Sequence, residues 1–108
     1  MNKLHIKPLP ISKAFQGRWF KTKLCKDYEE DVGYLLPKLK APKGKLFLRL
    51  EFGFSSKNSD LDNPVKIFVD ILQKKYEFND KQIYLMEVAK EDVKKGEEYI
   101  AFDISVLE

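Results

Sequence analysis

Residues 45–76 read KLFLRLEFGFSSKNSDLDNPVKIFVDILQKKY, and their hydrophobic period changes partway through. In the first ten residues the period is two, with Arg49, Glu51 and Gly53 on the polar face. This alternation predicts a β-strand with one buried face, formed by Leu46, Leu48, Leu50, Phe52 and Phe54. It is the clearest strand of the chain.

The residues after Asn63 follow the period of a helix instead. Apolar side chains recur at intervals of three and four residues, at Val65, Phe68, Val69, Leu72 and Tyr76. This spacing predicts an amphipathic helix that turns one stripe toward a core. Pro64 suits the first turn of such a helix, and Asp62 or Asn63 is the expected N-cap.

Weaker patterns of the same two kinds extend over the rest of the chain. We expect further strands at residues 3–7, 82–89 and 99–106, and a second helix at residues 24–36 that Pro37 ends. The strand at 82–89 is apolar enough to be buried on much of both faces, and residues 11–23 should be irregular. The order is roughly β-α-β-α-β-β, which predicts a single α+β domain over residues 1–108, with a mixed sheet and two main helices.

Composition limits the chemistry that this chain can perform. Hydrophobic residues make up 44% and charged residues 34% of 108 positions, a globular composition, and no apolar run approaches the ~20 residues of a membrane span. The chain has one histidine, His5, and one cysteine, Cys25, which argues against zinc sites and nucleophilic triads. We expect an exposed strand residue at His5, an apolar filler at Cys25, and a reducing cytoplasmic location without a membrane.

Charge is unevenly divided between the two halves of the chain. Residues 1–50 hold 12 Lys/Arg against 4 Asp/Glu, and residues 51–108 hold 8 against 13. Such asymmetry suggests nucleic-acid contact, although a basic solvated face is an equal alternative on charge alone. The most basic stretch carries Lys13, Arg18, Lys21, Lys23 and Lys26. We interpret it as a phosphate-binding segment, whose aromatic residues Phe15, Trp19 and Phe20 are better explained as core or dimer contacts than as base stackers.

Asp60 and Asp62 crowd two carboxylates just before the predicted helix. In an extended chain, residues two apart point to the same side, so both carboxylates can face one point. Their repulsion is relieved by a cation, and Mg²⁺ or Mn²⁺ suits oxygen ligands. A calcium-binding EF-hand loop is excluded, because its fifth, sixth and twelfth positions would be Pro64, Val65 and Ile71.

Three further charged residues could belong with this pair. Lys66 and Asp70 follow Asp62 at intervals of four, so all three should lie along the polar side of the helix. Asp80 could return to the same sheet edge, if the strand after it lies beside the strand ending at Phe54. Each residue also has an ordinary explanation: a helix cap for Asp62, a surface ion pair for Lys66 and Asp70, and a turn for Asp80.

The grouping of these residues resembles the RusA-type Holliday junction resolvases. The matching residues are Asp60-Leu61-Asp62-Asn63, Lys66, Asp70-Ile71-Leu72 and Asp80-Lys81-Gln82-Ile83. The early residues Pro10, Lys13, Gly17, Arg18, Lys21 and Thr22 also look like the N-terminal region of that family. One departure is Asn79, which stands where the family often has an additional acid.

The resemblance implies a homodimeric, Mg²⁺-dependent endonuclease of phage or prophage type that nicks four-way DNA junctions symmetrically in recombination and repair. It implies that Asp60, Asp62 and Asp80 bind the metal ion and that Lys66 is catalytic, with Mn²⁺ as a substitute for Mg²⁺. Asp70 is expected to support Lys66. DNA contacts are expected from Lys13, Arg18, Lys21 and Lys23.

Two alternatives remain open at this level. The chain could be a non-catalytic DNA-binding or phage-assembly protein, in which the carboxylates cap and solvate. It could also be a nuclease of the same family that acts on other branched DNA, such as flaps or forks.

Overall fold

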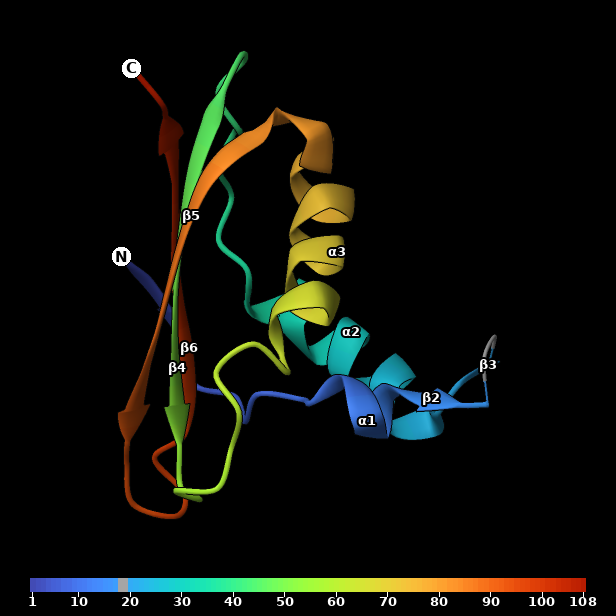
Figure 1. Ribbon diagram of the computed structural model, residues 1–108. Coiled ribbons are helices and arrows are strands. Elements are labelled where there is room, and N and C mark those ends of the chain that lie inside the picture. Colours follow the sequence, from blue (N-terminus) through green and yellow to red (C-terminus); the bar gives the residue numbers. More distant parts are fainter. Residues whose placement is uncertain (18–19) are drawn as a thin grey trace.

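The computed structural model describes residues 1–17 and 20–108 and shows one mixed sheet with helices packed on one of its faces (Figure 1). The sheet consists of β1 (Asn2–Leu4), β6 (Tyr99–Val106), β4 (Leu46–Phe54) and β5 (Ile83–Asp92), in that spatial order. β4 pairs with β5 in parallel, whereas β6 pairs antiparallel with both β4 and β1. The predicted α+β fold class is therefore confirmed.

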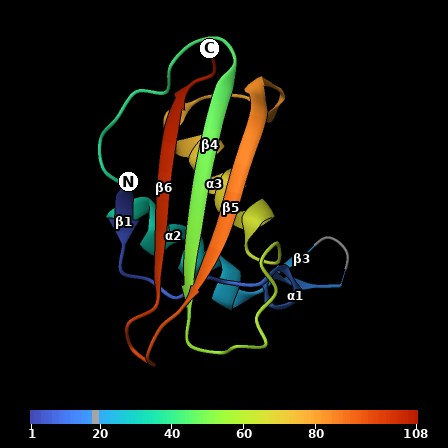
Figure 2. The ribbon, with the colours of Figure 1, turned by 60° about the vertical axis from the view of Figure 1, so that its left-hand side comes forward.

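β4 lies inside the sheet, and its predicted alternation is confirmed. Leu46, Leu48, Leu50 and Phe52 are each at most 2% exposed, and Phe54 is 9% exposed. These side chains face the helices, whereas the opposite face of the sheet has no helix over it among the residues that the structure describes (Figure 2). The core therefore lies between the sheet and the helices.

Two main helices cover the inner face, α2 (Lys23–Leu35) and α3 (Val65–Tyr76). α3 connects the parallel strands β4 and β5, and the predicted apolar stripe packs into the core along with Ile67 and Ile71. The expected cap of α3 is wrong: the N-cap position is Pro64, whose ring offers no capping group. Asp62 instead accepts the Val65 N–H through its backbone carbonyl at 3.1 Å.

The prediction that residues 82–89 form a strand buried on both faces is wrong. β5 is an edge strand, and each of its residues is half-buried or exposed. On β5, the side chains of Ile83, Met86 and Val88 pack against the core. Leu46 pairs with Ile83 and Phe47 pairs with Leu85, so Tyr84 is skipped in the pairing with β4, and its side chain is exposed. Tyr84 and Leu85 are 61% and 44% exposed.

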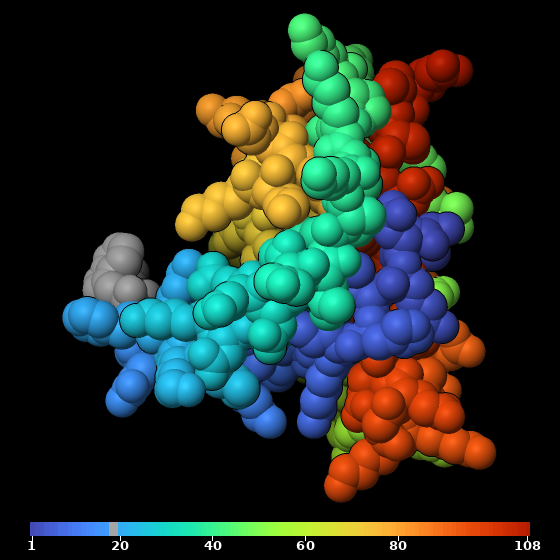
Figure 3. All heavy atoms as spheres, turned by 180° about the vertical axis from the view of Figure 1, so that it is seen from behind, coloured from blue at the N-terminus to red at the C-terminus, as the bar shows by residue number. Residues whose placement is uncertain are grey.

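The N-terminal segment is more regular than expected. It contains a short helix, α1 (Ile11–Ala14), and a small hairpin of β2 (Phe15–Gln16) and β3 (Phe20–Lys21) that projects from the body of the molecule (Figures 1 and 3). β1 ends at Leu4, so His5 is exposed, as predicted, but lies just beyond the strand. Cys25 is buried, as expected of an apolar filler.

A long connection, residues 36–45, runs from α2 to the start of β4 (Figure 3). The Tyr76 hydroxyl donates a hydrogen bond of 2.6 Å to the Pro37 carbonyl, and Leu39 and Ala41 pack against the core. This connection therefore closes one side of the core. Within residues 1–17 and 20–108, the helices are all too short or too polar to cross a membrane.

Candidate functional site

The candidate metal ligands lie at opposite ends of α3. Asp60 and Asp62 belong to the loop between β4 and α3, whereas Asp80 follows α3 and opens a short 3-10 helix, Asp80–Gln82. The twelve residues of α3 span about 18 Å at 1.5 Å per residue. The Asp80 N–H bonds to the side chain of Gln73, in the last two turns of α3, so Asp80 lies toward the end of the helix that is far from Asp60 and Asp62.

The expectation that Asp80 returns to the sheet edge of Asp60 and Asp62 is therefore wrong for a single chain. β5 does lie beside β4, but the two strands are parallel, with Leu46 opposite Ile83. Asp80 thus lies near the start of β4, and Asp60 lies beyond its end. In the described part of the chain, His, Cys, Asp and Glu side chains form no group of three that could hold a metal ion.

The loop that carries Asp60 and Asp62 is folded into turns rather than extended. The Asp60 carbonyl accepts the Asn63 N–H at 3.4 Å, and both aspartates are exposed. Within residues 1–17 and 20–108, neither carboxylate has a hydrogen-bond or ion-pair partner. Two uncompensated oxygen ligands therefore remain available at this loop.

Contacts from two other elements fix the position of this loop. The Ile11 N–H donates to the Asn63 carbonyl at 3.0 Å, which ties the loop to α1. The Lys90 ammonium donates to the Ser59 carbonyl at 2.9 Å, which ties it to β5. The acidic loop is therefore held between the N-terminal segment and the end of the sheet.

Asp80 shares a different hollow with Lys66 and Asp70. This hollow, about 420 Å³, lies between α3 and β5. Lys66 Nζ is 3.6 Å from Asp70 Oδ2, which gives the surface ion pair that the spacing predicted. Lys66 lies only one turn after Asp62, so it stands between the two groups of acids.

Gln73 links Asp70 to Asp80 and was not predicted from the sequence. Its amide nitrogen donates to Asp70 Oδ1 at 3.4 Å, and its amide oxygen accepts the Asp80 N–H at 2.9 Å. The available signal was its position three residues after Asp70, on the same helical face. Asp70 is therefore connected to the acid at the far end of α3.

Asn79 has a structural role of its own. Its side chain accepts the Lys81 N–H at 2.9 Å, and its N–H donates to Gln82 Oε1 at 3.0 Å, forming a capping box for the short 3-10 helix. The cap fixes the backbone at Asp80, whose carboxylate has no ion-pair partner among the described residues. Asn79 thus stabilises the turn that carries Asp80.

Two of the four predicted DNA-binding residues are already paired with acids. Lys21 Nζ donates a hydrogen bond of 2.8 Å to Glu29 Oε2, which raises the pKa of the Lys21 ammonium. Lys23 Nζ lies 3.1 Å from Asp27 Oδ2. The basic stretch contains no acid before Asp27, but α2 brings Asp27 and Glu29 next to these two lysines.

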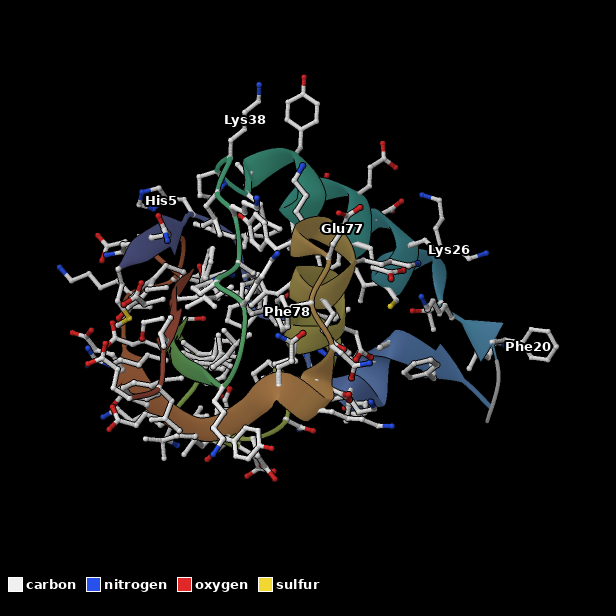
Figure 4. All side chains as sticks on the ribbon, turned by 90° about the horizontal axis from the view of Figure 1, so that it is seen from above. His5, Phe20, Lys26, Lys38, Glu77 and Phe78 are labelled. Carbon is white, nitrogen blue, oxygen red and sulfur yellow. The ribbon has the colours of Figure 1, made fainter. Side chains whose placement is uncertain are left out.

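The remaining predicted DNA-binding residues and the aromatic residues have different environments. Lys13 lines the hollow of about 300 Å³ that Asp60 also lines, and Arg18 and Trp19 lie outside the described residues. Phe20 is 74% exposed and points away from the body, and Phe15 is 38% exposed (Figure 4). Neither phenylalanine is therefore a core residue of a single chain.

Comparison of the chain with protein-family models and with curated proteins returned no match. The resemblance to the resolvases therefore depends on the motif residues and on what their arrangement can do.

Proposed function

We propose that this chain is a Mg²⁺-dependent endonuclease that cuts four-way DNA junctions by paired nicks and works as a homodimer in the cytoplasm. The observation that carries this proposal is the loop before α3, which presents two unpaired carboxylates, Asp60 and Asp62, with Lys66 one helical turn away. A hard divalent cation prefers such oxygen ligands. Their exposure leaves room for a DNA backbone.

The residues of the chain divide the chemistry between them. Asp60 and Asp62 would hold the ion, and Mn²⁺ can replace Mg²⁺ at oxygen ligands. A bound ion would polarise the scissile phosphate and lower the pKa of a water ligand. Lys66 contributes positive charge where the phosphate gains negative charge, and Asp70 holds the Lys66 side chain at 3.6 Å.

A homodimer also resolves the separation of Asp80 from the other two acids. We infer that a second copy of the chain supplies Asp80 to the ligand set of Asp60 and Asp62, because the described residues of one copy form no group of three such ligands. A twofold-symmetric pair would then contain two equivalent metal centres. Two centres match the two strands that a junction resolvase must nick.

The direct test is cleavage of a synthetic four-way junction. With Mg²⁺ we expect paired nicks, and Asp62→Asn should lower the cleavage rate at least ~100-fold while junction binding in EDTA is retained. Lys66→Ala should lower the rate by about 100- to 1,000-fold. Lys74→Ala, which removes the same charge at the other end of α3, is the matched control and should cut normally.

Two results would count against the proposal. An inactive wild-type protein with both Mg²⁺ and Mn²⁺ would overturn the nuclease function. Faster cutting of flaps or forks than of four-way junctions would keep the nuclease but change its substrate to other branched DNA.

The separation of the three acids favours one competing function, a DNA-binding or phage-assembly protein without catalysis. In that case Asp60 only solvates the loop and repels DNA. DNA binding should then be insensitive to Mg²⁺, and Asp60→Asn should leave binding unchanged or strengthen it. The nuclease predicts instead that Asp60→Asn abolishes both cleavage and the effect of Mg²⁺ on binding.

A further inference from the structure

The hollow beside Asp60 is lined by residues of the N-terminal segment and of the acidic loop before α3. It has a volume of about 300 Å³, and its apolar floor is formed by the buried residues Pro8, Phe54 and Pro64. The walls are polar: one carries Lys7, Ser12 and Lys13, and the other carries Ser56, Asn58 and Asp60. A small polar group can therefore reach both walls at once.

The two lysines of this hollow are available to a ligand. Among the described residues, neither Lys7 nor Lys13 forms an ion pair. The other acid at the hollow, Glu98, already accepts hydrogen bonds from the Ser55 hydroxyl and the Gly96 N–H, both at 2.8 Å. The hydrogen bond from Ser55 lowers the pKa of Glu98, and the nearby charge of Lys7 contributes to this shift. The hollow thus combines two ammonium groups without an ion pair among the described residues, hydroxyl and amide donors, and the carboxylates of Asp60 and Glu98.

The segment that carries the lysines is fixed by its backbone. Pro8 and Pro10 restrict the chain between them, and the Ile11 N–H bonds to the Asn63 carbonyl of the acidic loop. The Thr22 hydroxyl donates to the Lys13 carbonyl at 2.8 Å. Because the backbone is already ordered, only the side chains need to become ordered when a ligand binds here.

We propose that Lys7, Ser12 and Lys13 bind a backbone phosphate of DNA in this hollow, next to the phosphate that is cut at Asp60. Ammonium and hydroxyl groups are the usual donors to DNA phosphates, and such contacts position the strand without reading its sequence. Because this phosphate site belongs to the proposed nuclease, it explains how the strand is aligned at Asp60. It also gives a role to Lys7, which charge patterning alone did not single out.

Salt dependence of junction binding tests this site without requiring cleavage. In EDTA, affinity for a labelled four-way junction is measured by fluorescence anisotropy over a range of salt concentrations. Each lost phosphate contact should reduce the slope of log K against log salt by about 0.9. Lys7→Ala and Lys13→Ala should each show this reduction, and each should weaken binding about 5- to 10-fold at moderate salt.

Lys38→Ala is the matched control, because Lys38 is exposed, points away from the body of the molecule (Figure 4) and does not line the hollow. It removes the same charge and should leave the slope unchanged. Thermal unfolding of all three variants shows whether the fold is retained. A second arm titrates inorganic phosphate, which should compete with the junction only weakly if the site recognises a DNA strand rather than a free anion.

The outcomes of this experiment distinguish a failure of the phosphate site from a failure of the proposed nuclease. If the wild-type protein does not bind the junction, both the proposed nuclease and this site are overturned. If the wild-type protein binds and the Lys7 and Lys13 variants keep the control slope, only this phosphate site is overturned. Tight binding of inorganic phosphate that Lys7→Ala abolishes, without any change in the junction slope, would also overturn it.

Discussion

At the scale of single residues, Tyr28 places a polar hydroxyl group in the core. It is 5% exposed, and its hydroxyl lies beside the Leu9 backbone without a well-formed hydrogen bond to any described residue. Burial raises the pKa of this phenol well above its ordinary value of 10.0. A buried hydroxyl without a good partner reduces stability, because its hydration is lost and not replaced.

Removing the Tyr28 hydroxyl should therefore be harmless or stabilising. We expect Tyr28→Phe to leave the free energy of unfolding at pH 7 unchanged or to raise it by about 1 kcal/mol. Above pH 10 the unfolded chain ionises Tyr28 and the folded chain does not, so the stability of the wild type falls as pH rises, by about 1.4 kcal/mol per pH unit for this group. Urea unfolding from pH 8 to 11 should show a shallower alkaline decline in the variant; identical declines would contradict this explanation.

At the scale of elements, burial patterns were predictable from sequence where one face meets the core. The alternation in β4 and the stripe on α3 were correct because hydrophobic period follows burial directly. The prediction of burial failed for β5, because an apolar run such as IYLMEVA can occur in an edge strand as well as in a central strand. Helix caps were also only partly predictable from sequence. The spacing of Asn79 and Gln82 is that of a capping box, and the two residues form one. Asp62 has the residue type of an N-cap, but the N-cap position of α3 is Pro64.

The pairing of β4 with β6 depends on a glycine. Gly53 lies under the ring of Tyr99, and an added Cβ would overlap ring carbons of that side chain. The ring has little freedom to move, because its hydroxyl is 2.7 Å from Glu51 Oε2 and 2.6 Å from Glu91 Oε2. Lys3 Nζ lies 4.1 Å from the ring centroid. The glycine thus allows Tyr99 of β6 to contact residues of the other three strands of the sheet, β4, β5 and β1.

We expect Gly53→Ala to lower the free energy of unfolding by about 1–3 kcal/mol, because the added methyl group must displace a packed ring. Gly33→Ala in α2 is the matched control: a methyl group there would meet no described atom within 4 Å, and alanine favours helix by about 0.5–1 kcal/mol. Chemical denaturation of the two variants should therefore give opposite signs. Equal effects would show that the contact with Tyr99 is unimportant.

At the scale of the whole molecule, the sequence predicted the fold class but not the direction of the strands. The position of Asp80 depends on whether β5 runs parallel or antiparallel to β4, and neither composition nor periodicity reports that direction. The motif singled out three acids as one group, but their separation along α3 is a property of topology. In the proposed homodimer, a second chain brings them into one metal centre.

Mixed dimers of two inactive variants test this claim most directly. Asp62→Asn and Asp80→Asn should each be inactive alone in the Mg²⁺ cleavage assay. If each centre takes Asp60 and Asp62 from one copy and Asp80 from its partner, a dimer with one copy of each variant retains one intact centre. Mixing the two proteins under conditions of subunit exchange should therefore restore nicking of one strand of a four-way junction. If the wild type cuts and the exchanged mixture stays inactive, the shared metal centre is contradicted.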